Sequence, residues 1–578
     1  MAAEKYIIER AQSWLQGNID EDTKQRVKSL LEQGDEELVN AFYKDLEFGT
    51  GGLRGIMGVG TNRMNKYTVG MTTQGLANYL LDTYPNTEIK VAIAYDCRLN
   101  NTYFAQITAD VLSANGIKVF VFDDLRPTPE LSFAIRHLGC HSGVMITASH
   151  NPKEYNGYKV YWNDGGQIVP PHDKNIIREV KKIKSPDDVR FNGDTKLIES
   201  IGEQIDTAYV TMMESLSLSP DVITRQKDLG IVYTPLHGTG VKLVPMALQA
   251  FGFQNIHNVG EQDVVDGNFP TVHSPNPEEP AALDMAIKQA EHVDANLVMG
   301  TDPDADRVGI AVKNDQGKFE LLNGNQTASI LIYYLLTKWQ EAGKLTGKEY
   351  IAKTVVTTEL LQRIADHFNV PVYNTLTGFK WIADLIRQKE NKEMFIGGGE
   401  ESYGYLVGDF VRDKDAVVSC AMIAEAAAWA ADKGKTLYQL LPEIYSKFGF
   451  YYERLMSVKR EGKEGADEIQ QWMKNYRANP PKTINGSPVY LVKDYDTSKA
   501  HYIKENRSEN IDLPKSNVLQ FITEDGSKIT MRPSGTEPKI KYYFSVNEKL
   551  DNDADFEGNK KALDQKIDAI IADLKLEK

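Results

Sequence analysis

The stretch Gly143-Val-Met-Ile-Thr-Ala-Ser-His-Asn-Pro152 joins a short apolar run directly to a polar turn. Similar apolar runs, rich in β-branched residues, recur along the chain and are separated by segments in which apolar residues have helical spacing. We expect strands at Val91–Tyr95, Val119–Phe122, Gly143–Thr147, Ile231–Thr234, Leu297–Gly300, Val308–Val312, Ile351–Thr357 and Met394–Ile396. We expect helices at segments such as Thr73–Thr83, Ala282–Glu291 and Ser329–Ala342. This alternation predicts an α/β fold with largely parallel sheets.

The two ends of the chain differ from this pattern. Residues 1–45 read as two charged amphipathic helices, and the second runs through Leu30, Leu31, Leu38 and Phe42. Near the other end, Lys539–Val546 is an expected strand, and a closing helix has on one side Leu563, Ile567, Ile570, Ile571 and Leu574. We therefore expect a helical extension at 1–45, α/β domains at 46–205, 206–320 and 321–455, and a smaller α+β domain at 456–578.

Composition excludes several classes of function. The 578 residues carry a net charge of −15, from 81 acidic and 66 basic residues, which argues against nucleic acid or an anionic membrane as a partner. Cys97, Cys140 and Cys420 are far apart and form no CxxC pair, so neither a disulfide framework nor a thiolate metal site is indicated. The N-terminus lacks the long uncharged run of a signal peptide, and no segment reaches a membrane-spanning length. We expect a cytoplasmic protein.

Ser149 lies in the polar turn of the opening stretch, at the position after a strand where α/β folds place their functional sites. A serine followed by histidine and asparagine is a candidate nucleophile, although it needs an activating base or a phosphorylated resting state. The alternative is a turn in which Ser149 caps the next helix. A lipase-type nucleophile elbow is not indicated, because the G-x-S-x-G pattern is absent here.

The segment Asp302-Pro-Asp-Ala-Asp-Arg307 places three aspartates at alternate positions. Alternate carboxylates can face one cation, and their hard oxygen atoms suit Mg²⁺ or Ca²⁺. The segment is not a calcium loop of the EF-hand type, because Arg307 replaces the required glycine and Lys313 replaces the final glutamate. A phosphate oxygen could complete the ligand set, with Arg307 offsetting its charge. The alternative is a solvated acidic turn.

A third polar loop, Gly399-Glu-Glu-Ser-Tyr-Gly404, follows the expected strand Met394–Ile396. Carboxylates bind neighbouring sugar hydroxyls well, because each carboxylate can accept several hydrogen bonds. The loop is therefore a candidate site for a carbohydrate, and its alternative is an ordinary acidic glycine turn.

Two further loops are suited to anions. Arg532-Pro-Ser-Gly-Thr-Glu-Pro538 combines an arginine fork, two hydroxyls and the N–H groups of a glycine turn, which together can hold a phosphate dianion. A surface turn capped by Ser534 is the alternative. The segment Gly49–Gly55 is rich enough in glycine for close backbone approach to an anion, but it lacks the Gly-Lys-Ser/Thr of a Walker A loop.

These loops occur together, in this order, in one family. On Thr147–Pro152 (TASHNP), Asp302–Arg307 (DPDADR), Gly399–Ser402 (GEES) and Arg532–Pro538 (RPSGTEP), the chain resembles the α-D-phosphohexomutases, the phosphoglucomutase and phosphomannomutase superfamily, over roughly residues 45–545. The resemblance implies three α/β domains with mixed sheets and a smaller fourth domain around a central active-site cleft. It also implies an intramolecular phosphotransferase of the isomerase class that uses Mg²⁺, with a phosphosugar as substrate and glucose 1,6-bisphosphate as activator and intermediate.

The resemblance implies a role for each loop. Ser149 would carry the catalytic phosphate, and an oxygen of that phosphoserine would join the Mg²⁺ ligands Asp302, Asp304 and Asp306. The residues expected to bind sugar hydroxyls are Glu400 and Ser402, with Lys380 as a further substrate contact. The residues expected to bind the non-reacting phosphate are Arg532, Ser534, Gly535 and Thr536. The residues expected near the reacting phosphoryl group are Arg54, His150, Lys159 and Arg307.

The implied reaction transfers the phosphoryl group of Ser149 to the free hydroxyl of a sugar 1- or 6-phosphate, and the bound 1,6-bisphosphate then turns over and returns its other phosphate. Lys159 or His150 would carry the hydroxyl proton, and Lys159 is favoured provided that nearby cations lower its pKa. We expect a monomer or weak dimer.

The third loop departs from part of the family. Some members have Gly-Glu-x-Ser-Gly-His, whereas this chain has Tyr403 and Gly404, a form similar to that of glucose-type mutases. We therefore expect a mutase that interconverts glucose 1-phosphate and glucose 6-phosphate, with mannose phosphates as further candidate substrates. The chain resembles a longer branch of the family that also includes phosphopentomutases, so the preferred sugar stays open among glucose, mannose and pentose phosphates, and a phosphopentomutase and a glucose 1,6-bisphosphate synthase are the alternatives. The alternative of another class is a non-catalytic phosphosugar-binding protein.

Overall fold

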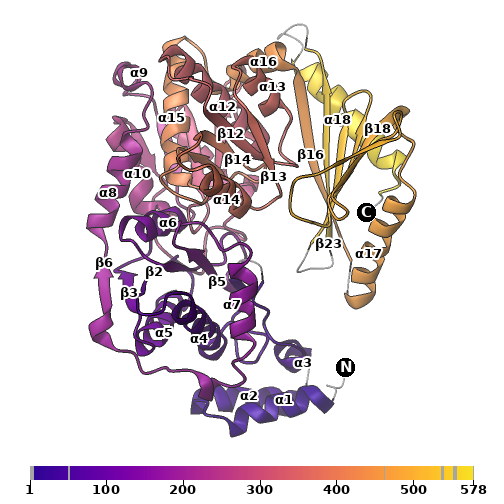
Figure 1. Ribbon diagram of the computed structural model, residues 1–578. Coiled ribbons are helices and arrows are strands. Elements are labelled where there is room, and N and C mark those ends of the chain that lie inside the picture. Colours follow the sequence, from indigo (N-terminus) through magenta and orange to yellow (C-terminus); the bar gives the residue numbers. More distant parts are fainter. Residues whose placement is uncertain are drawn as a thin grey trace. The chain divides into compact units, whose positions relative to one another are not determined.

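The computed structural model describes residues 5–34, 36–49, 52–460, 462–534, 539–550 and 556–576 (Figure 1). The chain divides into two compact units. The first comprises residues 1–322, 379–396 and 402–434, and the second comprises residues 323–378, 397–401 and 435–578. Among the described residues, no helix is both long enough and apolar enough to cross a membrane.

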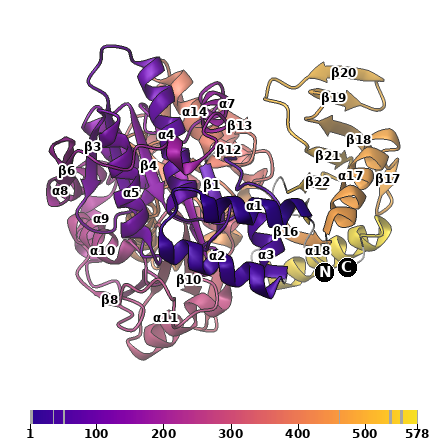
Figure 2. The same ribbon diagram turned by 90° about the horizontal axis from the view of Figure 1, so that it is seen from below.

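The described N-terminal residues form three helices, α1 (Lys5–Gln16), α2 (Glu21–Gln33) and α3 (Glu36–Phe42), which lie side by side (Figure 2). Their apolar faces share one small core, which includes Ile7, Val27 and Phe42. The expectation of two helices was wrong, because α2 ends at Gln33, where the following Gly34 has a left-handed backbone with φ of 60° and caps the helix.

The first unit contains a sheet in the order β1-β5-β4-β2-β3-β6. Its strands are β1 (Gly52–Ile56), β2 (Lys90–Tyr95), β3 (Lys118–Phe122), β4 (Ser142–Ile146), β5 (Tyr155–Trp162) and β6 (Ile198–Ile201). Strands β2, β3, β4 and β6 are parallel, whereas β5 runs antiparallel to both of its neighbours. The antiparallel β5 makes the sheet mixed.

Helices cover both faces of this sheet, and Figure 1 shows α4 and α5 on the side opposite α6. The helices of this region are α4 (Lys66–Thr83), α5 (Asn101–Ala114), α6 (Thr128–His137) and α7 (His172–Val180), followed by the short 3₁₀ turns Pro186–Asp188 and Thr195–Leu197. Central strands such as β2 and β4 are therefore buried on both faces, which explains why they are largely apolar rather than alternating between apolar and polar residues.

A second sheet of the first unit has the order β11-β10-β9-β7-β8. Its strands are β7 (Ile231–Thr234), β8 (Ile256–Asn258), β9 (Leu297–Thr301), β10 (Val308–Lys313) and β11 (Phe319–Leu322). The associated helices are α8 (Glu203–Glu214), α9 (Pro220–Arg225), α10 (Gly240–Phe251), α11 (Pro280–His292) and α15 (Ala416–Asp432). Strands β9 and β10 pair antiparallel, so the aspartate-rich loop connects two adjacent strands.

A third sheet has the order β13-β12-β14-β15. Its strands are β12 (Glu349–Thr354), β13 (Val372–Thr375), β14 (Met394–Gly399) and β15 (Tyr405–Val407). The neighbouring helices in the sequence are α12 (Gly324–Glu341), α13 (Leu360–His367), α14 (Phe379–Lys389) and α16 (Leu437–Phe448). All the strands expected from apolar runs are present, so the prediction of α/β layers is confirmed.

The C-terminal part of the second unit is an antiparallel sheet in the order β16-β23-β22-β21-β18-β19-β20, with β17 paired to β18 (Figure 2). Its strands are β16 (Phe450–Lys459), β17 (Thr483–Ile484), β18 (Ser487–Asp494), β19 (Lys499–Tyr502), β20 (Arg507–Asn510), β21 (Leu519–Thr523), β22 (Lys528–Pro533) and β23 (Lys539–Glu548). Helices α17 (Gly462–Ala478) and α18 (Phe556–Asp573) pack on it. This β-rich region confirms the expected C-terminal α+β part.

Candidate active site

Ser149 follows strand β4 and has a left-handed backbone with φ of 53°. Such a conformation costs a non-glycine residue roughly 1–3 kcal/mol and is found at functional sites. The hydroxyl donates to Asp302 Oδ2 at 2.8 Å and lies 3.1 Å from His150 Nδ1. Strand β5 rather than a helix follows this turn, so the helix-cap interpretation is wrong. Ser149 instead faces a carboxylate 153 residues away in the sequence.

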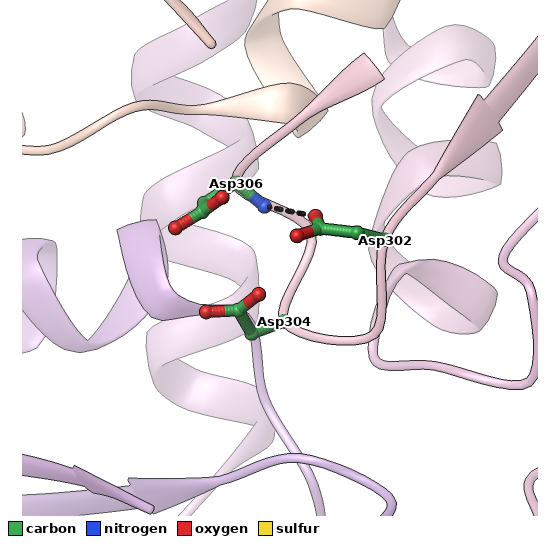
Figure 3. Close-up of side chains that lie close together, drawn as sticks. All are labelled: Asp302, Asp304 and Asp306. Atoms are coloured by element: carbon green, nitrogen blue, oxygen red, sulfur yellow. Dashed lines mark hydrogen bonds between the residues drawn. The ribbon is translucent and has the colours of Figure 1, made fainter. Parts of the chain in front are cut away.

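Asp302, Asp304 and Asp306 lie in the loop between β9 and β10, and their side chains converge (Figure 3). One oxygen from each carboxylate lies within 4.8 Å of the others. The loop is held in shape by Asp302 Oδ1, which accepts the N–H groups of Asp306 and Arg307 at 3.1 and 3.0 Å. All three side chains are buried, so the interpretation as a solvated acidic turn is wrong.

The charge of this cluster fits a divalent cation. Burial raises the pKa of the Asp302 carboxyl well above its ordinary range, and Asp304 and Asp306 raise it further. Burial also acts to raise the pKa of Asp304, but Lys159, the Thr128 hydroxyl and Lys414 together outweigh it and hold that pKa low. Oδ1 of Asp304 and Oδ1 of Asp306 are buried without a hydrogen-bond partner among the described residues. Buried, unpartnered oxygens in an all-carboxylate set are ligands suited to Mg²⁺.

Lys159 lies on β5 and contacts the same cluster. Its Nζ is 2.7 Å from Asp304 Oδ2 and 3.4 Å from Asp306 Oδ2. Burial acts to lower the pKa of Lys159, but Asp304 and Asp306 outweigh it and raise that pKa. The sequence-based condition for Lys159 as a base, a pKa lowered by nearby cations, is therefore not met in this structure.

His150, Arg54 and Arg307 surround the Ser149 turn. Burial lowers the pKa of His150 well below its ordinary value, and Arg307 and Arg54 lower it further, so the imidazole is neutral. Arg54 on β1 donates to Asn151 Oδ1 at 3.2 Å. Arg307 pairs with Glu278, and its Nε lies 3.9 Å from Asp306 Oδ1. The residues expected near the reacting phosphoryl group are thus brought to one place.

The glycine-rich segment before Arg54 is explained by packing. Gly52 has φ of 138°, and a Cβ at this position would lie 1.8 Å from the carbonyl oxygen of Tyr158 on β5. Only glycine allows β1 to approach β5 this closely. Thr50 and Gly51 of the same segment lie outside the described residues.

The third loop spans residues of both units. In the first unit, the Tyr403 carbonyl accepts the N–H of Val308 at 3.0 Å, which joins this loop to the end of the aspartate loop, and Ser402 is partly exposed beside Tyr403. Lys380 is the second residue of helix α14, and burial lowers its pKa. In the second unit, Glu400 accepts the N–H of Gly378 at 2.8 Å.

The fourth loop belongs to the second unit. Arg532 lies near the end of β22, opposite Lys541 of β23. The N–H of Ser534 donates to the Lys539 carbonyl at 2.7 Å, which links the end of β22 to the start of β23. Gly535 and Thr536 lie outside the described residues.

Comparisons with known proteins identify the family. Models of the phosphoglucomutase/phosphomannomutase α/β/α domains I, II and III match residues 45–187, 207–317 and 323–448. A phosphoglucomutase of Staphylococcus haemolyticus (strain JCSC1435) is 40% identical over 510 residues, which cover 88% of this chain and 91% of that protein. The chain belongs to the phosphoglucomutase/phosphomannomutase family. It is a mutase, an enzyme of the isomerase class.

Solved structures show the same fold. A phosphoglucomutase from Paramecium, pp63/parafusin in an open form, has a TM-score of 0.68 at 17% identity and covers 92% of this chain and 96% of its own. A phosphoglucomutase/phosphomannomutase family protein of Burkholderia thailandensis has a TM-score of 0.62 at 17% identity, over 91% of this chain and 97% of its own. At these identities the likeness concerns the fold alone.

Three residues that sequence reasoning missed support the site of this phosphoglucomutase/phosphomannomutase family member. Arg98 donates to the Ser149 carbonyl at 2.6 Å, Thr128 donates through Oγ1 to Asp304 Oδ2 at 2.8 Å, and Lys414 lies 3.1 Å from Asp306 Oδ2. A signal existed for Arg98, because it follows an expected strand as Ser149 does. Lys414 sits in the charged run Arg412–Asp415, which reads as a solvated surface although it is largely buried.

Proposed function

We propose that this mutase interconverts glucose 1-phosphate and glucose 6-phosphate through a phosphorylated Ser149 and a bound 1,6-bisphosphate. The observation that carries the proposal is the contact between Ser149 Oγ and Asp302, which puts a strained, buried hydroxyl beside a carboxylate cluster suited to a cation. The glucose-type form of the third loop, with Tyr403 and Gly404, supports glucose as the sugar.

In the proposed step, the bond between phosphorus and Ser149 Oγ breaks as a bond forms between phosphorus and the free sugar hydroxyl. The proton of that hydroxyl moves to the protein, and a proton returns to Ser149 Oγ. His150 is neutral and 3.1 Å from that oxygen, which supports it as a proton carrier. Lys159 remains the other candidate, and as an ammonium it also offsets negative charge around the reacting group.

The proposed metal ligands are Asp302, Asp304 and Asp306, with an oxygen of phosphorylated Ser149. When bound, Mg²⁺ would neutralise charge on the phosphoryl group during its transfer. Arg307 and Arg54 would add positive charge at the same place, because both act electrostatically on His150 beside Ser149.

The remaining loops are proposed to bind the substrate. The residues proposed for the sugar hydroxyls and their surroundings are Glu400, Ser402 and Lys380, and those proposed for the non-reacting phosphate are Arg532, Ser534, Gly535 and Thr536. We also propose the division into domains at 46–205, 206–320, 321–455 and 456–578. The fork geometry of Arg532 suits a phosphate dianion.

Steady-state kinetics test this function. The purified enzyme, activated with glucose 1,6-bisphosphate and Mg²⁺, is assayed in parallel with glucose 1-phosphate, mannose 1-phosphate and ribose 1-phosphate. We expect the highest kcat/KM for glucose 1-phosphate. A higher value for ribose 1-phosphate would replace the proposal with a phosphopentomutase, and a requirement for an acyl phosphate donor with little mutase flux would indicate a bisphosphate synthase.

A further inference from the structure

The two oxygens of the Asp306 carboxylate have different surroundings. Oδ2 lies 3.1 Å from Lys414 Nζ and 3.4 Å from Lys159 Nζ. Oδ1 is buried and accepts no hydrogen bond from the described part of the chain. Asp304 has the same asymmetry, since its Oδ2 accepts from Lys159 and Thr128 while its Oδ1 is buried without a partner among those residues. Each carboxylate therefore has one oxygen held at close range by protein and one that accepts no hydrogen bond from the described residues and suits a cation; in Asp306 that second oxygen, Oδ1, lies 3.9 Å from Arg307 Nε.

Lys414 is itself held firmly. It lies between β15 and α15, where its Nζ is 3.2 Å from Asp413 Oδ1. The other oxygen of Asp413 accepts the Tyr161 hydroxyl at 2.6 Å. Tyr161 is two residues after Lys159 on β5, so both side chains lie on the same face of that strand. A series of side-chain contacts, Tyr161–Asp413–Lys414–Asp306, therefore connects β5 to the aspartate loop between β9 and β10.

The third loop is shaped to admit this lysine. A Cβ at Gly404 would lie 2.1 Å from Lys414 Cδ, in contact with the aliphatic stem rather than with its flexible end. The glycine that distinguishes this chain from members with histidine at that position thus leaves space for Lys414. Because the side chain is only 13% exposed, its ammonium is directed to the carboxylates and not to solvent.

We propose that Lys414 is a positioning residue of the metal site. Its ammonium holds Oδ2 of Asp306 so that Oδ1 faces the cation. Lys414 thus shares with Lys159 the pairing with that carboxylate. The proposal rests on the proposed function, because it takes the aspartate cluster to be the metal site. Lys414 would not touch the substrate, and its effect would pass through Asp306 and Lys159.

The sign of one measurement separates positioning from simple electrostatics. An ammonium close to a divalent cation repels it, so if charge were the only effect, removing Lys414 would tighten cation binding. If Lys414 positions Asp306, removing it lets the carboxylate turn, and cation binding weakens. Substitutions of residues that support a metal ligand typically cost about 10- to 100-fold in affinity or activity.

The experiment compares wild-type protein with Lys414→Met, which removes the charge but keeps the stem, and Lys414→Arg, which keeps the charge. Mn²⁺ binding is measured by calorimetry without substrate, on samples matched for Ser149 phosphorylation by intact mass. Lys313→Met is the matched control, because Lys313 also pairs with an aspartate in the first unit but lies at the far end of β10. Thermal unfolding checks that each variant is folded.

We expect Lys414→Met to raise the Kd for Mn²⁺ about tenfold or more, Lys414→Arg to recover part of that loss, and Lys313→Met to match wild type. Equal or tighter Mn²⁺ binding by Lys414→Met would overturn the proposal. If Lys414→Met does not fold, Asp413→Asn tests the same contacts, because it removes the carboxylate that holds Lys414. We expect Asp413→Asn to weaken Mn²⁺ binding as well, and unchanged binding would overturn the proposal.

The result is distinguishable from failure of the proposed function. Wild-type protein that bound no Mn²⁺ would refute the metal site and the function with it. Wild-type protein that bound Mn²⁺ but did not convert glucose phosphates would refute the proposed substrate, and the comparison of Kd values would still decide the role of Lys414.

Discussion

Replacing Arg98 with methionine tests how the Ser149 turn is held. The Arg98 side chain is fully buried and donates to four carbonyls of this turn and the residues after it, those of Ser149, Asn151, Pro152 and Tyr155, at 2.6, 2.5, 2.9 and 3.0 Å. It also pairs with the equally buried Asp96 at 3.5 Å. Methionine replaces the apolar stem of arginine but has no guanidinium to donate, so the carbonyls and the carboxylate would lose their partner together.

The size of the effect follows from these contacts. Removing one partner of a buried ion pair costs about 3–5 kcal/mol, mostly because the other charge stays buried. Orphaned carbonyls add to this, but the contributions are not independent, so we expect the free energy of local opening to fall by about 4 kcal/mol. That is roughly a thousandfold faster amide exchange in this segment. A displacement of Ser149 by about 1 Å would lower kcat on the order of a hundredfold.

The assay is hydrogen–deuterium exchange by mass spectrometry, read on peptides that cover residues 147–156, because a chain with two units need not unfold in one transition. Arg136→Met is the control, since Arg136 is a partly exposed arginine of the same unit that pairs with Glu390. Adding Asp96→Asn to Arg98→Met should recover part of the protection, because it removes the uncompensated charge. If Arg98→Met showed the same amide exchange and the same kcat as the wild type, Arg98 would not hold the Ser149 turn.

Three further predictions concern the site and its pH dependence. Ser149→Ala should abolish mutase turnover while calorimetry still detects binding of glucose 1-phosphate; near-normal turnover would exclude a phosphoserine. Arg532→Ala should raise KM for glucose 1-phosphate by tenfold or more with a smaller change in kcat, and an unchanged KM would remove Arg532 from the phosphate site. Burial raises the pKa of Asp415 to about 6, although the Val418 N–H and the Tyr209 hydroxyl act to lower it. Because the folded state favours the protonated carboxyl, its contribution to stability is lost as pH rises from about 4 through 6. The free energy of unfolding of Asp415→Asn should therefore rise by about 1 kcal/mol relative to that of the wild type between pH 5 and pH 7, as measured by thermal unfolding at both pH values. Equal pH dependence of the two proteins would contradict the raised pKa of Asp415.

The sequence predicted strands such as β2, β4, β7, β9 and β10, which are buried along almost their whole length. It did not predict β1, β6, β8, β11, β13, β15 or β16–β22, several of which are short or partly exposed. Strand β5 escaped prediction, because Tyr155-Asn-Gly-Tyr-Lys159 reads as a polar turn. It forms a strand only through pairing with β1 on one side and β4 on the other, which is a tertiary effect. The break between α2 and α3 was missed for a related reason, because one left-handed glycine interrupted an otherwise continuous helical pattern at Gly34.

Some residues of the site could likewise be predicted from the sequence, and others could not. Ser149 and Asp302 could be predicted because polar residues directly after apolar strands indicate functional loops in α/β folds. Thr128 and Lys414 could not, because their function depends on Asp304 and Asp306, which are far away in the sequence; Thr128 and Asp304 are 176 positions apart. Local sequence patterns do not indicate contacts between residues so far apart. The sequence of a charged run such as Arg412–Asp415 is the same whether the run faces solvent or the aspartate loop.

Whether Ser149 carries the transferred phosphoryl group can be read from the mass of the intact protein, with localisation of any phosphate by peptide sequencing. Wild-type protein and Ser149→Ala are incubated with glucose 1,6-bisphosphate and Mg²⁺, then quenched with a chelator. We expect one added phosphoryl group at residue 149 in wild type, its loss on incubation with excess glucose 6-phosphate, and no addition in Ser149→Ala. A phosphoryl group at another residue, or an enzyme that turns over glucose phosphates without any phosphorylation of Ser149, would contradict this role of Ser149.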